Sequence, residues 1–270
     1  MTNICRIGVA GAAGRMGQML VRAIATTDGA KLTGGVEAPG SAALGRDLGE
    51  VAGIGAQGAK ITAEPAPLFA ACDAVLDFTV PAATMKHAAL AAERGIVHVV
   101  GTTALEPEQV KQLEGFARRT PIVFAPNMSV GINLLMALTE RVASILGGQD
   151  WDIEILEIHH NKKVDAPSGT ALGLGAAAAK GRKVELSKVA QRVRDGLTGP
   201  RRAGDIGFAT LRGGNVTGDH TVIFAGENER IELTHKSSSR EIYARGAVRA
   251  ALWAQGKPPG LYTMRDVLGL

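Results

Sequence analysis

The stretch Gly8-Val9-Ala10-Gly11-Ala12-Ala13-Gly14-Arg15-Met16-Gly17 decides the fold of this 270-residue chain. An apolar run over 4–10 predicts a buried strand before it, and the pattern over 16–26 predicts a helix after it. The last three glycines recur at every third position, which permits a tight turn, close approach of a phosphate and close strand–helix packing. This order is typical of a Rossmann-type domain, in which phosphates bind at the helix N-terminus.

A carboxylate ends the second predicted strand. That strand covers 31–36, and Glu37 follows it twenty residues after the last glycine of the turn. In dinucleotide-binding domains a carboxylate at this distance accepts hydrogen bonds from the adenosine ribose. Ala38 comes next, so no arginine stands there to bind a 2′-phosphate, although Arg46 or Lys60 could fold back. The pattern therefore favours NADH weakly, or use of both NADH and NADPH.

Two loops at the ends of later strands are further candidate cofactor contacts. One is Gly101-Thr102-Thr103 after the predicted strand 97–100, and the other is Ala125-Pro126-Asn127-Met128 after 122–124. Ligands of doubly wound sheets lie beyond the carboxyl ends of the strands, whereas turn chemistry alone would also explain these residues. The predicted cofactor contacts are Gly11, Ala12, Ala13, Gly14, Arg15, Met16, Glu37, Gly101, Thr102, Thr103, Ala125, Pro126, Asn127 and Met128.

The organisation of the chain changes near Asn127. Before it, short apolar strands alternate with helical patterns, which indicates a parallel sheet of βαβ units. After it, a helix over 134–146 leads to an alternating strand over 151–158, and broken strands over 206–234 suit a mixed sheet. We therefore predict an α/β protein. Residues 1–127 and 241–270 would form a Rossmann-type doubly wound parallel sheet domain, and 128–240 an inserted α+β domain with a mixed sheet.

A compact positive motif, Glu157-Ile158-His159-His160-Asn161-Lys162-Lys163-Val164-Asp165-Ala166-Pro167-Ser168-Gly169-Thr170, follows the alternating strand. His159 is a candidate general acid, because an unperturbed histidine exchanges its proton near pH 6.5. Lys163 could reach the same pocket and stabilise developing negative charge. Ser168 predicts a helix N-cap, whose N–H groups, with the Thr170 hydroxyl, could bind a carboxylate. The motif favours an enzyme that delivers hydride to a small anionic molecule.

Simpler interpretations exist for these residues. A histidine at a strand end is usually structural or exposed, and Asp165 could simply pair with a neighbouring lysine. A zinc site is disfavoured, because His159 and His160 lack the HExxH spacing and no cysteine is near. Cys5 and Cys72 lie in predicted strands and indicate buried free thiols in a reducing cytosol. We therefore expect no metal.

The composition excludes other classes of protein. The chain is 46% hydrophobic and 21% charged, and no apolar run approaches the roughly 18 residues of a spanning helix. The first residues also lack the basic and apolar regions of a secretion signal. A net charge of +4 with 4% aromatic residues indicates no nucleic-acid surface. The densest basic stretch outside the central motif is interpreted as a solvated loop and not as a binding arm: Arg192, Arg194, Arg201 and Arg202. Residues 195–204 are expected to form a mobile surface loop.

The chain resembles one family, the 4-hydroxy-tetrahydrodipicolinate reductases of bacterial lysine biosynthesis, long called dihydrodipicolinate reductases. The glycine turn resembles the cofactor turn of that family, and residues 157–171 resemble its signature E-x-H-H-x-x-K-x-D-x-P-S-G-T-A. Asp77-Phe78-Thr79, the loop at Gly101, residues 127–133 and His235-Lys236-Ser237-Ser238-Ser239-Arg240 match as well. The resemblance covers essentially the whole chain, and its central signature is highly specific.

This resemblance implies a cytoplasmic homotetramer that uses NADH or NADPH to reduce a cyclic dicarboxylate to tetrahydrodipicolinate with loss of water. His159 would be the proton donor and Lys163 would support catalysis. The inserted domain would carry the substrate site and the tetramer contacts. Some family members have an arginine where Ala38 stands, so the coenzyme preference stays open. The substrate carboxylates would be held by His160, Ser168, Gly169, Thr170 and Arg240.

Two other functions stay open from the residues alone. An aldehyde dehydrogenase of the aspartate-semialdehyde type would need a nucleophilic cysteine, and both cysteines lie in predicted strands. A dinucleotide sensor without enzymatic activity would use the glycine turn. It would give no reason for two histidines and two lysines beside an anion-binding helix start.

Overall fold

The first unit contains a seven-stranded sheet with the strand order of a nucleotide-binding domain. In the computed structural model, which describes residues 4–270, the order is β12-β6-β5-β4-β1-β2-β3 and all neighbours are parallel. The order reverses between β1 and β4, where doubly wound sheets bind their ligands. The predicted Rossmann-type sheet is confirmed. Its strands are β1 (Cys5–Ala10), β2 (Ala30–Val36), β3 (Ile61–Thr62), β4 (Ala74–Asp77), β5 (Val97–Val100), β6 (Pro121–Phe124) and β12 (Gly260–Tyr262).

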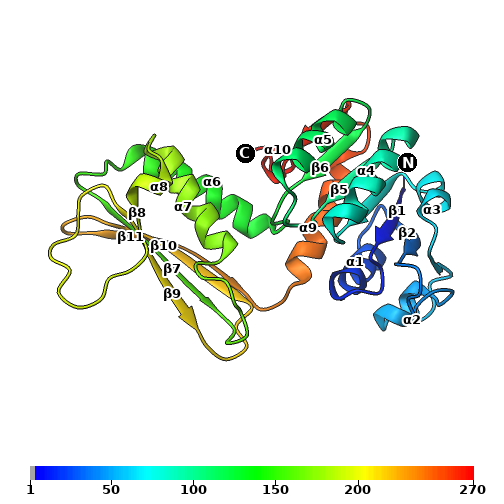
Figure 1. Cartoon of the computed structure of the whole chain (residues 1–270), viewed down its shortest axis with the longest axis horizontal. Helices are drawn as coiled ribbons and strands as arrows, with labels where there is room; N and C mark the ends of the chain where they lie inside the picture. Colours follow the sequence, from blue (N-terminus) through cyan, green and yellow to red (C-terminus); the bar gives the residue numbers. More distant parts are fainter. Residues whose placement is uncertain (1–3) are drawn as a thin grey trace. The chain divides into compact units, whose positions relative to one another are not determined.

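Helices fill the connections of this unit (Figure 1). They are α1 (Arg15–Ala25), α2 (Leu48–Ala52), α3 (Pro65–Ala71), α4 (Pro81–Arg94), α5 (Pro107–Ala117), α9 (Glu241–Ala254) and α10 (Met264–Leu268). Proline occupies the first turn of α3, α4 and α5, where its missing N–H leaves no intrahelical bond unmade. The buried faces of α1 and α9 pack with β1 and β4 in one core, which includes Leu20, Ile24 and Val248. This core holds the strand ends that carry the predicted cofactor residues.

The second unit contains a mixed five-stranded sheet of order β11-β10-β7-β9-β8. β10 is antiparallel to β7 and β11, whereas β9 is parallel to β7 and β8. Buried residues alternate along β7 and β10, and they pack with α6 and α7 in a separate core. The predicted α+β domain with a mixed sheet is confirmed. Its elements are α6 (Val130–Ile145), β7 (Asp152–His159), α7 (Gly169–Gly181), α8 (Leu186–Val189), β8 (Ala190–Gln191), β9 (Ile206–Arg212), β10 (Gly218–Ala225) and β11 (Arg230–Ser237).

The contacts of the chain divide it after Val130 and before Arg240, so that Gly131–Ser239 forms the second unit. The first unit combines the N-terminal part with Arg240–Leu270. Cys5 and Cys72, in the first unit, are buried free thiols, as predicted. Over the described range 4–270, no helix is both long and apolar enough to cross a membrane.

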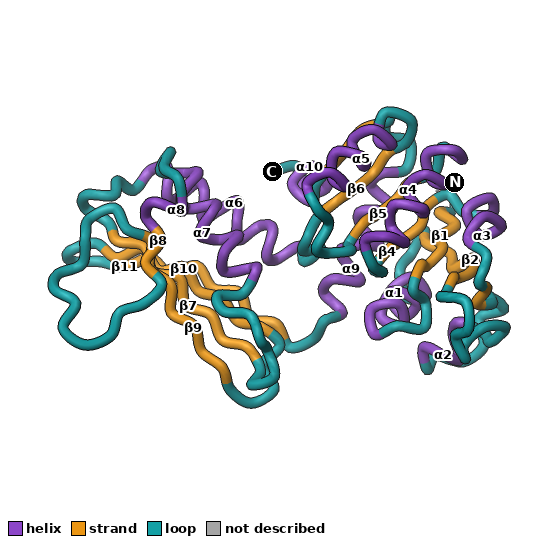
Figure 2. Tube along the Cα trace, in the orientation of Figure 1, coloured by secondary structure: helices purple, strands orange, loops and turns teal. Residues whose placement is uncertain are grey.

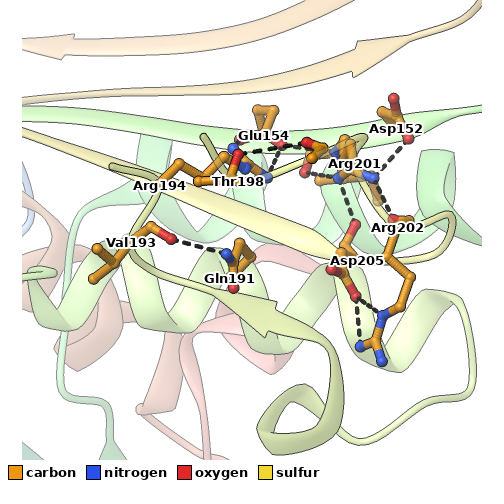
Figure 3. Close-up of polar contacts among 11 residues, drawn as sticks. Asp152, Glu154, Gln191, Val193, Arg194, Thr198, Arg201, Arg202 and Asp205 are labelled. Atoms are coloured by element: carbon orange, nitrogen blue, oxygen red, sulfur yellow. Dashed lines mark hydrogen bonds and ion pairs between the residues drawn. The ribbon is translucent and has the colours of Figure 1, made fainter. Parts of the chain in front are cut away.

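The long loop between β8 and β9, drawn in teal in Figure 2, is held against β7 by two arginines. Arg201 donates hydrogen bonds to Glu154 at 2.9 Å and to Asp152 at 2.6 Å (Figure 3). Arg194 forms a two-pronged pair with Glu154, with both distances 2.8 Å. Arg194 remains 37% exposed despite this pairing, whereas Arg201 is only 19% exposed. The prediction of solvated side chains is therefore wrong for Arg201, because β7 supplies carboxylates that lie 47 and 49 residues away in sequence.

Candidate active site

The glycine turn lies at the carboxyl end of β1. Gly11 has a φ of +70°, a backbone conformation that favours glycine. The N–H groups of Gly11 and Ala12 donate to the Val36 carbonyl at 2.9 and 3.2 Å, so the turn is fastened to the end of β2. A Cβ on Gly17 would overlap the Gly11 carbonyl oxygen, so α1 can begin here only with glycine at that position. The exposed start of α1 at Gly14 therefore fits a pyrophosphate.

Glu37 directly follows β2 and is bonded to the glycine turn. Its Oε1 accepts the Ala13 N–H at 2.8 Å, and its Oε2 accepts the Ala38 N–H at 3.2 Å. The carboxylate is half-buried, at the position where Rossmann domains bind a ribose. Ala38 is exposed, and Arg46 and Lys60 are exposed residues of the connection from β2 to β3. The residues present fit a dinucleotide.

A buried hydrogen-bond network joins the ends of β4 and β5. Asp77 is fully buried, and its Oδ2 accepts hydrogen bonds from His87 Nδ1 at 2.8 Å and His98 Nε2 at 3.2 Å. Thr102 Oγ1 accepts the Thr79 N–H at 3.0 Å and lies 3.3 Å from Asp77 Oδ1. Burial raises the pKa of Asp77, but the hydrogen bonds from the two histidines outweigh burial and lower it. The ionised carboxylate therefore fixes the loops after both strands.

The other predicted cofactor residues lie along the same sheet edge. A Cβ on Gly11 would lie 3.0 Å from Thr79 Cγ2, so the turn after β1 is adjacent to the loop after β4. A Cβ on Gly101 would overlap the Phe78 ring, which explains glycine after β5. Met128 is only 1% exposed, and its side chain belongs to the core of the unit. Exposed or half-buried positions at this edge are Ala13, Gly14, Arg15, Met16, Gly101, Thr103, Pro126 and Asn127.

In the second unit, His159 ends β7 and contacts Glu157, two residues earlier on the same face of the strand. The distance from His159 Nδ1 to Glu157 Oε2 is 2.5 Å. Glu157, with a side chain 1% exposed, also accepts hydrogen bonds from Arg212 at 2.8 and 3.0 Å and from the Ser168 N–H at 3.0 Å. Burial raises the pKa of Glu157, but these hydrogen bonds outweigh burial and lower it. The carboxylate is therefore ionised.

A second histidine, His220 on β10, packs edge-on against His159. The ring centroids are 5.1 Å apart, and His220 Nε2 lies 3.2 Å from Ser168 Oγ. Burial, followed by the charge of His159, lowers the pKa of His220 to about 4, so this ring is neutral at pH 7. A Cβ on Gly218 would lie 2.8 Å from His159 Nε2, so glycine lets β10 approach the imidazole.

Helix α7 begins beside these side chains. Ser168 is its N-cap, as predicted, and its Oγ accepts the Ala171 N–H at 3.1 Å. The hydroxyl and N–H of Ser168 are therefore both bonded within the protein. A Cβ on Gly169 would meet nothing within 4 Å, so the helix start is open. The first N–H groups of a helix lack partners inside it and attract anions.

The remaining predicted substrate residues lie in different places. The Lys163 N–H donates to the His160 carbonyl at 3.1 Å, so both belong to the turn after β7. Lys163 Nζ lies 2.8 Å from Asp165 Oδ1, the pairing that the simpler interpretation considered. Arg240 instead belongs to the first unit, where it precedes α9. Between residues 4 and 270, no three or more His, Cys, Asp or Glu residues cluster so as to hold a metal ion.

Sequence reasoning did not assign Glu157, Arg212 or His220 to the site. The alternating pattern of β7 was a usable signal for Glu157, because residues two apart on a strand share a face. Arg212 and His220 come close to His159 only through the pairing of β7 with β9 and β10. That register is not visible in the sequence.

Comparisons with known proteins agree along the whole chain. Residues 5–128 match the family model of the N-terminus of dihydrodipicolinate reductase, and residues 131–268 match that of its C-terminus. The chain is 58% identical over 262 residues to a 4-hydroxy-tetrahydrodipicolinate reductase of Brucella abortus (strain 2308), covering 97% of this chain and 98% of the relative. A relative from Rhodopseudomonas palustris (strain HaA2), of the same description, is 58% identical over 265 residues, which cover 98% and 97% of the two chains.

A solved structure shares the fold. It is the dipicolinate-bound dihydrodipicolinate reductase of Paenisporosarcina sp. TG-14, with a TM-score of 0.80 and 24% identity. The match covers 97% of this chain and 98% of that one. The likeness therefore includes both units of the fold.

Proposed function

The chain belongs to the dihydrodipicolinate reductase family and reduces 4-hydroxy-tetrahydrodipicolinate with a nicotinamide cofactor in lysine and diaminopimelate biosynthesis, and we propose that His159 donates the proton. The supporting observation is the hydrogen bond of 2.5 Å between His159 Nδ1 and a buried carboxylate. This bond orients the ring beside the open start of α7. The His159 side chain is largely buried, but it keeps 11% of its surface exposed.

The remaining steps are divided among the residues of the two units. The bound nicotinamide supplies the hydride, which is chemistry of the cofactor itself. In the first unit, the start of α1 binds the pyrophosphate and Glu37 binds the ribose. In the second, the start of α7 and His160 hold the substrate carboxylates, with Ser168 capping the helix. A cyclic dicarboxylate substrate agrees with the dipicolinate bound to the structural neighbour.

Lys163 is proposed to stabilise negative charge that develops on the substrate. Its Nζ is paired with Asp165, whose side chain is 55% exposed, so this ion pair is weak enough to be exchanged for a substrate anion. Arg240 is a further proposed substrate contact. The alternative of an aldehyde dehydrogenase lacks a reactive cysteine. Burial is the main cause that raises the pKa values of Cys5 and Cys72 to about 12, so neither thiol ionises readily.

NADPH is expected not to be preferred over NADH. The 2′-phosphate of NADPH would meet the Glu37 carboxylate and the exposed Ala38, with no arginine at that position. The measurement is the absorbance of the reduced nicotinamide, with substrate made in situ from pyruvate and aspartate semialdehyde by the preceding synthase. Ala38→Arg is the matched variant and should raise kcat/KM for NADPH alone. A large NADPH preference in the unmodified enzyme would overturn this assignment.

Thr170→Val is expected to raise the KM for substrate by about tenfold or more while kcat changes little. The hydroxyl is proposed to donate a hydrogen bond to a carboxylate, and such bonds to charged groups contribute about 1.5–3 kcal/mol. Valine keeps the shape of threonine. Thr221→Val is a suitable control, because that hydroxyl contacts Thr234 at 3.0 Å and has no proposed role in binding. An unchanged KM in Thr170→Val would remove Thr170 from the substrate site.

The second unit is also proposed to carry the contacts of a homotetramer, and the enzyme to work in the cytoplasm. Family membership supports both assignments, and the buried free thiols additionally suit a reducing compartment. Light scattering at assay concentration measures the molar mass, and a monomer would contradict the tetramer.

A further inference from the structure

Glu157 is the most heavily bonded side chain around His159. Its two oxygens accept two hydrogen bonds from the Arg212 guanidinium, one from the Ser168 N–H and one from the His159 ring. Its side chain is 1% exposed, so the carboxylate cannot exchange these partners for water. Two further contacts hold Arg212 itself, to the carbonyls of Leu211 and Asp165 at 2.6 and 2.7 Å. The arrangement is a rigid clamp on one edge of the imidazole.

The clamp decides which nitrogen of His159 carries its permanent proton. An ionised carboxylate can only accept, so Nδ1 must donate to Glu157 at 2.5 Å. Nε2 is then the nitrogen that gains and loses the exchangeable proton. Without the carboxylate, the neutral imidazole could instead keep its single proton on Nε2, and Nδ1 would then be the nitrogen that gains and loses the exchangeable proton.

The charges around the ring are balanced. The Arg212 cation lies against both Glu157 oxygens and offsets the negative charge that would otherwise act on His159. His220 faces the ring from β10 and is neutral at pH 7, since burial lowers its pKa to about 4. His235 on β11 lies opposite His220 in the strand register. Lys163 and Asp165 form an ion pair with each other on the turn after β7. The charges that act on the imidazole at short range are therefore those of Glu157, which contacts the ring, and of Arg212, which contacts Glu157.

We propose that Glu157, held by Arg212 and the Ser168 N–H, is a positioning residue that fixes His159 in the form whose Nε2 donates the proton. This inference rests on the proposed role of His159 as the acid. Glu157 would act through His159 and would not touch the substrate. Arg212 would set how strongly the carboxylate stabilises the protonated ring.

Substitutions of the two clamp residues should move the pH profile in opposite directions. Glu157→Gln removes the anion, which disfavours the imidazolium, so the pH above which kcat falls should decrease by about one unit or more. Its kcat should also decrease about 10- to 1000-fold, the scale of losing such an orienting partner. Arg212→Gln leaves the negative charge of Glu157 uncompensated, so the pH above which kcat falls should increase. We call this falling part of the pH profile its limb. Loss of structure alone would lower kcat in both variants and shift neither limb.

Glu154→Gln is the matched control. Glu154 lies on the same strand and is also bound by two prongs of an arginine, Arg194, but it faces the loop of Figure 3. Its kcat and pH profile should match those of the unmodified enzyme. If Glu157→Gln fails to fold, Arg212→Gln and the milder Arg212→Lys still test the direction of the shift. Unshifted limbs in these variants would overturn the proposal.

The tautomer of His159 gives a readout that does not depend on turnover. In protein labelled with ¹⁵N-histidine, NMR should find the proton of the neutral ring on Nδ1, and in Glu157→Gln on Nε2 to a larger extent. The His159 signals are identified by their absence in His159→Ala. If His159→Ala keeps full activity, the proposed function fails. If that variant is inactive while Glu157→Gln keeps the original tautomer and pH profile, only the role of Glu157 fails.

Discussion

His159→Ala is expected to lower kcat by about two to four orders of magnitude, the usual contribution of a general acid. Proton donation from Nε2 would be lost, whereas the cofactor residues of the first unit are unchanged. The measurement is synthase-dependent oxidation of NADH, followed by absorbance and run beside the unmodified enzyme. Binding of NADH, followed by fluorescence, should persist. A variant that is slow but binds its cofactor would separate a defect in chemistry from a defect in folding.

Two controls make this result specific to the imidazole. Lys162→Ala changes an exposed residue of the same motif, and its kcat should stay within about twofold of the original, as for most surface substitutions. Added imidazole should restore part of the activity of His159→Ala in proportion to its concentration, because it can act as a diffusible acid. Turnover near that of the unmodified enzyme in His159→Ala would exclude His159 as the proton donor.

The glycine turn could be predicted from sequence because its requirements are local. Gly11 needs a positive φ and Gly17 needs room against the Gly11 carbonyl, and both constraints act within seven consecutive residues. The same holds for Ser168, which caps a helix that starts at the next residue. Such features depend on neighbours in the chain, so the sequence alone carries them.

The clamp around His159 could not be predicted, because it depends on strand register. Arg212 is 55 residues away from Glu157 in sequence and meets it only because β7 pairs with β9 in one alignment. A shift of one residue would turn Arg212 to the other face of the sheet. The arginines that bind Glu154 escaped prediction for the same reason, since a basic loop and a half-exposed strand are each ordinary on their own.

Several short elements were also missed. α2, β3 and β12 contain five, two and three residues, too few to show a period. α5 is longer, and it carried a usable signal: Glu106 and Gln109 form a capping box around Pro107. The sequence therefore contains enough local information to predict a helix over 107–117.

Asp77→Asn is expected to lower the free energy of unfolding of the first unit by about 3–5 kcal/mol, as does breaking other buried charge pairs. The carboxylate is fully buried and accepts from both His87 and His98. An asparagine would present an NH₂ donor to one side and leave a buried histidine without its acceptor. Urea unfolding measures the loss, followed by Trp253 fluorescence in a Trp151→Phe background, because Trp253 belongs to the first unit and Trp151 to the second.

Asp73→Asn is the comparison that isolates burial in this prediction. Asp73 pairs with Arg6 at 2.7 Å, but the two side chains are 31% and 53% exposed, so its loss should cost only about 0–1 kcal/mol. The pH dependence gives a second test. Folding lowers the pKa of Asp77, so the ionised carboxylate stabilises the folded protein. This stabilisation is complete above the pKa of Asp in the unfolded chain, about 3.9, and disappears as the pH falls further. The difference in free energy of unfolding between the unmodified protein and Asp77→Asn should therefore be constant near neutrality and shrink below about pH 4. Equal losses in the two variants, or a deficit unchanged in acid, would show that the buried carboxylate does not stabilise the fold as an anion.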